Sequence, residues 1–122
     1  MGVQERIVID SKSVEVEKFL WGEIRWLWSS KINSEAQQTF GIVQINPGHK
    51  NAAHIHSNCE ELLYVISGEC EHGVGKEVYN LRKGMLIYIP PGIDHYAINN
   101  GKEPFEAVIS YSSPDRMMSI AE

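Results

Sequence analysis

The sequence contains no long apolar run, few cysteines and little helical periodicity. No stretch of its 122 residues approaches the about 18 consecutive apolar residues of a membrane-spanning helix, and its N-terminus lacks the apolar core of a secretion signal. Two cysteines, Cys59 and Cys70, are too few for a disulfide framework, so we expect free thiols. These absences predict a cytoplasmic protein without a membrane partner.

Basic side chains are outnumbered by acidic ones. The chain has 11 Lys and Arg against 16 Asp and Glu, a formal net charge of −5. Nucleic acid requires a basic footprint, so we expect no nucleic-acid partner. Hydrophobic residues make up 43% and charged residues 22%, which is close to the average for globular proteins, and the length suits a single core. We therefore expect one domain over residues 1–122.

Short apolar runs alternate with turn residues along the chain. Runs rich in Val, Ile, Tyr, Phe and Trp recur at intervals of about ten residues, which is typical of a sandwich or barrel of short strands. The predicted fold class is all-β. Strands are predicted at residues 7–9, 24–29, 39–45, 61–67, 70–73, 77–81, 85–89, 95–99 and 105–111.

Two segments are less regular. Residues 13–20 carry apolar side chains that suit either one helical turn or a strand, and both alternatives stay open. In the tail, Ser113 as a cap and Pro114 as a first helical residue predict a short helix that begins near residue 113.

Three histidines and one carboxylate occur at spacings that suit a metal site. On a strand, His54 and His56 project from the same face. Glu61 begins the next apolar run, and His95 follows the rigid turn at residues 90–92. Three imidazoles and a carboxylate suit Mn, Fe, Co, Ni, Cu or Zn and exclude Ca. The ligand set does not choose among these metals.

These residues resemble the two motifs of the cupin family. Residues 48–68 match the first motif at Gly48, His54, His56, Glu61 and Gly68. Residues 84–99 match the second at Gly84, Pro90, Gly92, His95 and Asn99. Met85 departs from the pattern, because many cupins have an acidic residue there. The resemblance implies a single antiparallel β-barrel of jelly-roll type, with one divalent metal held inside by His54, His56, Glu61 and His95.

Neighbouring polar residues have simpler interpretations. Of the adjacent pair Glu60 and Glu61, only one can face inward, and the motif spacing to Gly68 favours Glu61. His49 and His72 are expected at the surface. Cys59 occupies no named position of the two motifs, so we expect no metal ligand there. It also precedes two glutamates that would raise the pKa of its thiol, so we expect no nucleophile.

Strand alternation also predicts the wall of the cavity. Counted from Glu61 and His95, the side chains of Leu63, Val65 and Ala97 point inward, whereas Tyr64 and Tyr96 point away. The wall is then mostly apolar. No second ionisable group stands out as a general base, so the catalytic residues beyond the metal stay unassigned.

An open metal site in an apolar barrel indicates catalysis on a small molecule. We expect a metal-dependent isomerase, epimerase or lyase that acts by Lewis-acid catalysis on a sugar, sugar acid or keto acid. The alternatives are a non-haem iron dioxygenase and a non-catalytic cupin that binds a small ligand. The complete ligand set argues against the last.

The N-terminal strands exceed what the barrel needs. Residues 1–38 carry Trp21, Trp26 and Trp28, whose apolar surface must be covered. We expect this region to lie at the interface of a homodimer, as the cupin resemblance also implies.

Overall fold

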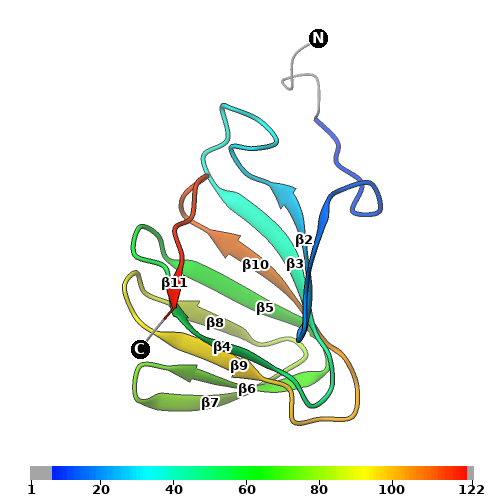
Figure 1. Cartoon of the computed structure of the whole chain (residues 1–122), viewed down its shortest axis with the longest axis vertical. Helices are drawn as coiled ribbons and strands as arrows, with labels where there is room; N and C mark the ends of the chain where they lie inside the picture. Colours follow the sequence, from blue (N-terminus) through cyan, green and yellow to red (C-terminus); the bar gives the residue numbers. More distant parts are fainter. Residues whose placement is uncertain (1–6, 121–122) are drawn as a thin grey trace.

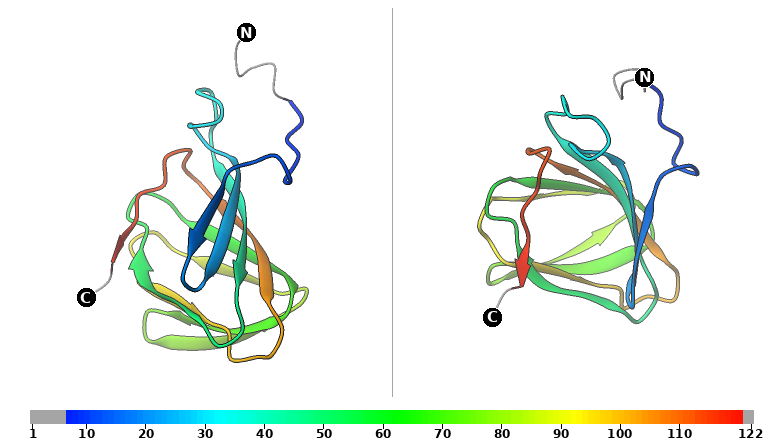
Figure 2. Two further views of the ribbon diagram at one scale, coloured as in Figure 1. Left: turned by 45° about the vertical axis from the view of Figure 1, so that its right-hand side comes forward. Right: turned by 45° about the horizontal axis from the view of Figure 1, so that its top comes forward.

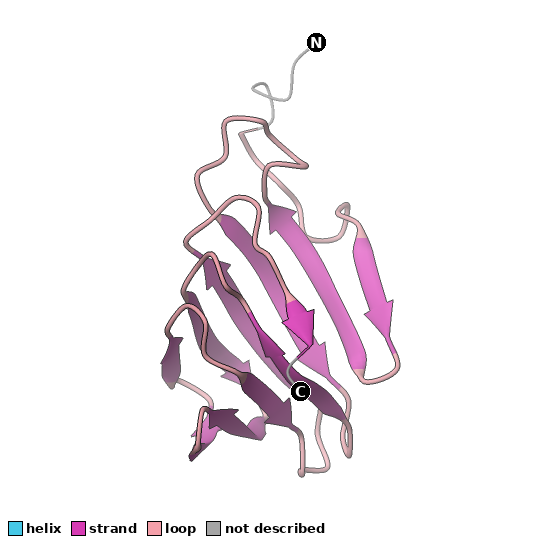
Figure 3. Ribbon diagram, turned by 60° about the vertical axis from the view of Figure 1, so that its left-hand side comes forward, coloured by secondary structure: helices cyan, strands magenta, loops and turns pink. Residues whose placement is uncertain are grey.

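The computed structural model describes residues 7–120, which consist of strands joined by loops (Figure 3). The strands are β1 (Val16–Phe19), β2 (Gly22–Trp28), β3 (Thr39–Ile45), β4 (Lys50–Ile55), β5 (Glu61–Ser67), β6 (Glu69–Val74), β7 (Glu77–Arg82), β8 (Leu86–Ile89), β9 (His95–Ile98), β10 (Phe105–Tyr111) and β11 (Ser119–Ile120). In this part of the chain, no helix is long and apolar enough to cross a membrane.

The strands form two antiparallel sheets that face each other (Figures 1 and 2). One sheet has the order β1-β2-β3-β10-β5-β8 and the other the order β11-β4-β9-β6-β7. The predicted all-β jelly roll is therefore confirmed. Among the described strands no ladder joins the two sheets, so the barrel is jelly-roll-like rather than closed by hydrogen bonds.

The core lies between the sheets and follows strand alternation. Along β3, β5 and β10 every second side chain is buried, which places apolar residues on the inner face. Leu63, Val65 and Ala97 are buried, and Tyr64 is exposed, as predicted. The inner faces are therefore fixed by the two-residue period of the sequence.

The two ends of the interior differ in polarity. β5 and β10 run antiparallel, so that Glu61 pairs with Tyr111 at one end. The fully buried Val65 and Phe105 lie toward the other end, where apolar side chains fill the space. Glu61 lies at one end of the interior, whereas the buried Asn99 lies near the other, where its amide donates to Ile45 O.

Several sequence expectations were wrong. Residues 7–9 form no strand, because Ile7 and Val8 are exposed and pack against no sheet. The tail forms no helix at residues 113–118; the side chain of Asn58 holds its backbone through Asp115 O and Met117 N, and β11 pairs with β4. The list of predicted strands did not include β4. Its first four residues, Lys-Asn-Ala-Ala, have low β-propensity.

The open segment at residues 13–20 is a strand. β1 and β2 form a hairpin with Phe19 opposite Gly22 at its tip, and β2 continues the pairing onto β3. The hairpin extends the larger sheet at its edge, as the blue strands of Figure 1 show. Residues 1–6 and 121–122 of the expected single domain lie outside the described residues.

Gly68 and Gly84 allow a matched test of the turn between β5 and β6. Both have positive φ, +80° for Gly68 and +91° for Gly84. A Cβ at Gly68 would overlap the carbonyl oxygen of Pro104, whereas a Cβ at Gly84 would meet no atom within 4 Å.

We expect Gly84→Ala to lower the free energy of unfolding by roughly 1–2 kcal/mol through backbone strain alone. Gly68→Ala carries the same strain and must also displace the backbone at Pro104, so its loss should be larger. Urea unfolding of the metal-free variants measures both. Equal losses would show that the turn at Gly68 tolerates a Cβ.

Candidate metal centre

Three strands from the two sheets bring the predicted residues together. His54 lies near the end of β4 and pairs with His95, the first residue of β9. His56 follows β4 directly. Glu61 begins β5 in the opposite sheet. The two motifs therefore meet between the sheets.

The side chains converge on one point. The ring nitrogens of His54, His56 and His95 include a set that lies within 4.8 Å of one another. Glu61 Oε1 is 3.3 Å from His56 Nε2 and 3.3 Å from His95 Nε2. His56, Glu61 and His95 are 2–4% exposed. Ligand atoms that each bind one ion at about 2.1 Å are separated by similar distances.

The hydrogen bonds of the rings fix which nitrogen faces this point. The Nδ1 atoms of His54, His56 and His95 donate to the carbonyl oxygens of Ala52, Met117 and Ile93 at 2.8, 3.0 and 3.2 Å. Because a carbonyl only accepts, each Nδ1 carries the proton and each Nε2 presents a lone pair. Backbone contacts of this kind orient metal-binding histidines.

The atoms at the centre have no other partner. His56 Nε2, Glu61 Oε1 and His95 Nε2 are buried and make no hydrogen bond within the described residues. Buried polar atoms of native proteins are normally satisfied. One cation at the point of convergence would satisfy all three atoms. The donor set therefore fits a divalent transition metal, which is the cofactor of this chain.

The charges of the centre also suit a cation. Burial alone would raise the pKa of Glu61, but the adjacent imidazoles of His56 and His95 lower this pKa to about 2. Burial, together with His95, lowers the pKa of His54 to about 4. At neutral pH Glu61 is therefore a carboxylate and His54 a neutral imidazole, the protonation states in which both side chains bind metals.

A cavity of about 260 Å³ adjoins the histidines. Its apolar wall includes Leu63 and Ala97, which were predicted to point inward, together with Ile24, Val43 and Ile109. Glu61 is the only acidic residue that lines the cavity among the described residues, whereas Lys50 and Arg116 contribute positive charge. Apart from the carboxylate of Glu61, the charged side chains of the cavity therefore favour an anionic molecule.

The two cations rest on aromatic rings. The guanidinium of Arg116 lies 4.5 Å from the ring centre of Trp26 and 5.4 Å from that of Tyr111. Lys50 Nζ lies 4.7 Å from the ring centre of Tyr96. Within residues 7–120 neither cation forms an ion pair with a carboxylate. Both side chains are therefore available to pair with a bound anion.

Besides Lys50 and Arg116, the sequence analysis missed His72 and Tyr111 as cavity residues. His72, expected at the surface, is 2% exposed and lines the cavity, and burial lowers its pKa to about 4. It pairs with Ala97, which had been assigned to the inner face, so strand pairing would have revealed it. Tyr111 contacts the ring of His56 edge-on at 5.0 Å, and burial raises the pKa of its phenol well above the ordinary value.

The remaining candidates fall outside the cluster. His49 is exposed and contacts Pro47 O, as predicted for a surface residue. Glu60 is half-buried, with its backbone nitrogen bonded to Ser112. Cys59 and Cys70 are free and buried; burial raises the pKa of Cys59, and the charge of Glu61 raises it further. The Cys59 thiol is therefore not activated as a nucleophile.

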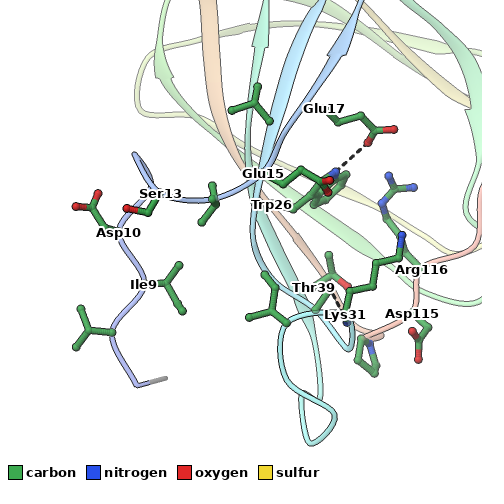
Figure 4. Close-up of a pocket in the computed structure, with 16 residues that line it drawn as sticks. Ile9, Asp10, Ser13, Glu15, Glu17, Trp26, Lys31, Thr39, Asp115 and Arg116 are labelled. Carbon is green, nitrogen blue, oxygen red and sulfur yellow. Dashed lines mark hydrogen bonds between the residues drawn. The ribbon is translucent and has the colours of Figure 1, made fainter. Parts of the chain in front are cut away.

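A second, larger groove of about 1090 Å³ lies beside Trp26 (Figure 4). One wall is the N-terminal segment with Ile9, Asp10 and Glu15, and Glu17 accepts a hydrogen bond of 2.9 Å from Trp26 Nε1. Arg116 borders both this groove and the metal cavity. Within residues 7–120, the only metal-sized group of His, Cys, Asp or Glu is the histidine cluster.

Two curated proteins are similar to this chain over part of its sequence. The polyketide synthase CurC of Streptomyces cyaneus is 28% identical over 105 residues, which are 86% of this chain and 68% of that protein. Oxalate oxidase GF-2.8 of Triticum aestivum is 33% identical over 79 residues, which are 58% of this chain and 35% of that protein.

Solved structures share the fold. Oxalate decarboxylase of Lactobacillus farciminis, in a formate complex, superposes with a TM-score of 0.82 at 26% identity over 89% of this chain. This chain covers 34% of the decarboxylase, so it spans about one third of the length of the two oxalate enzymes.

The family model of the cupin domain matches residues 41–111, which include all four converging side chains and both predicted motifs. Since this match covers more than half of the 122 residues, the chain belongs to the cupin domain family.

Proposed function

We propose that this cupin is a metal-dependent enzyme that acts on a small carboxylic acid, such as a sugar acid or keto acid, as an isomerase, epimerase or lyase. The observation that carries the proposal is the set of buried, unpartnered nitrogen and oxygen atoms that face one point beside a cavity bearing two free cations. His54, His56, Glu61 and His95 are the proposed ligands.

Each part of the site has a distinct role in this proposal. A bound metal supplies Lewis-acid polarisation of a carbonyl or hydroxyl oxygen. Arg116 and Lys50 attract the carboxylate of the substrate, and the apolar wall excludes water, which strengthens these charge interactions. The raised pKa of Tyr111 keeps its hydroxyl protonated next to the centre, where it can donate a hydrogen bond.

The names of the relatives agree with a small acidic substrate. Oxalate oxidase and oxalate decarboxylase are named for a small dicarboxylate. A second candidate is a non-haem iron dioxygenase, in which oxygen and substrate would share the open positions of the metal. A cupin that binds a small ligand without turnover is the third alternative.

The ligand assignment predicts the metal content of defined variants. We expect one divalent transition metal per chain in the purified protein, and none in the folded double variant His54→Ala plus His56→Ala, which loses two of four ligands. Elemental analysis after exhaustive dialysis measures this. Cys59→Ser and His49→Ala are the controls and should keep the full metal content. A folded double variant with undiminished metal would refute the assignment.

The reaction class is tested with small 2-hydroxy and 2-keto acids in D₂O, under argon and in air. We expect the metal-loaded protein to catalyse proton exchange beside the carbonyl, or carbon–carbon cleavage, equally well in both atmospheres, as followed by NMR. His95→Ala should lose this activity. Product formation that consumes oxygen would favour the dioxygenase, and binding without turnover would favour the binding protein.

We also propose that the chain is a homodimer that covers the N-terminal strands within residues 1–38. Support comes from the β1–β2 hairpin at the edge of the larger sheet, where Leu20 is 96% exposed and Phe19 37% exposed. Phe19 stacks on Trp21 with ring centres 4.6 Å apart, so the tip presents a continuous apolar surface.

Sedimentation equilibrium at micromolar concentration tests the dimer. We expect the wild type to have twice the monomer mass and Leu20→Asp to shift toward the monomer, because a carboxylate would be buried in the interface. Leu86→Asp, at an exposed position on β8, is the matched control and should stay dimeric. A monomeric wild type contradicts the proposal.

A further inference from the structure

His72 differs from the other histidines that line the metal cavity. It lies on β6 opposite Ala97, with its side chain on the inner face and 2% of its surface exposed. His54, His56 and His95 each donate Nδ1 to a backbone carbonyl. Both ring nitrogens of His72 are buried and without a hydrogen-bond partner in the described residues.

Burial of both ring nitrogens of His72 is unfavourable unless a molecule in the cavity forms a hydrogen bond with one of them. A neutral imidazole has one N–H donor and one nitrogen acceptor, and burial of both without partners costs free energy that an apolar side chain of the same size would not cost. The residues that line the cavity provide no partner. A molecule that binds in the cavity can supply one.

His72 is close to the metal centre without belonging to it. Its ring is nearly parallel to that of His95, with an interplanar angle of 8° and ring centres 6.1 Å apart. The nitrogen atoms that lie within 4.8 Å of one another come from His54, His56 and His95 alone. A small molecule held beside these three histidines therefore lies next to His72.

We propose that His72 determines substrate specificity by donating a hydrogen bond to a carboxylate oxygen that does not bind the metal. This inference rests on the proposed function, since it assigns a partner to the acid held at the metal centre. A 2-hydroxy acid fits this arrangement, because its hydroxyl and one carboxylate oxygen can chelate a metal while the second carboxylate oxygen stays available to His72.

The experiment uses the Co²⁺-loaded full chain and two probes, glycolate and fluoride. Glycolate has the additional carboxylate oxygen, whereas fluoride is a single atom that reports only on the metal. Binding of each probe is followed through the visible absorption of Co²⁺. The variants are His72→Phe, which removes the hydrogen bond at similar size, and His72→Gln, which retains a donor. His49→Phe is the surface control.

We expect His72→Phe to keep its Co²⁺ and its fluoride affinity but to bind glycolate about 5- to 30-fold more weakly, the effect of one lost hydrogen bond. His72→Gln should bind glycolate within about threefold of the wild type. His49→Phe should match the wild type for both probes.

Three results would overturn the inference: unchanged glycolate affinity in His72→Phe, a parallel loss of both probes, or loss of the metal. If neither His72 variant folds, the test is hydrogen exchange measured by NMR on the Zn²⁺-loaded wild type with ¹⁵N-labelled histidine. The His72 ring N–H should become protected from exchange when glycolate is added, and unchanged exchange refutes the hydrogen bond. A wild type without metal, or without affinity for glycolate, instead refutes the proposed function.

Discussion

The interior of this protein is organised around a buried carboxylate, Glu61, and three imidazoles that face the same point. Burial of Glu61 as an anion is unfavourable unless positive charge or hydrogen-bond donors lie beside it. The imidazoles of His56 and His95 are the nearest groups, and a divalent cation between them would supply the missing charge. Apolar side chains such as Val65 and Phe105 fill the interior toward the opposite end of these strands.

The metal centre could be predicted because its residues lie in two short motifs whose spacing and turn residues can be read directly from the sequence. His54 lies in β4 and His56 directly follows it, and the glycines and prolines around them set the turns that bring Glu61 and His95 near. The inner positions of β5 and β9 followed from alternation alone. Where side-chain period and turn chemistry agreed, the sequence was sufficient to place the residues.

The features that were missed depend on contacts between distant segments. The Lys-Asn-Ala-Ala start of β4 has little intrinsic strand preference, and pairing with β9 and β11 makes it a strand. The tail has good helix-start residues, yet Asn58 holds it extended. His72 is buried because β9 pairs beside it, which no property of its own segment indicates.

The C-terminal tail, residues 113–118, contacts the metal centre and borders the groove beside Trp26. Met117 offers its carbonyl to His56, its amide bonds to Asn58, and Arg116 borders both cavities. Because coupling free energies are reciprocal, a cation that fixes the His56 ring also favours the ordered form of the tail. Any molecule that pulls the tail away must in turn weaken the hold on that cation. The hydrogen bond from His56 thus joins the metal centre to a segment that lies outside the residues 41–111 matched by the cupin domain model.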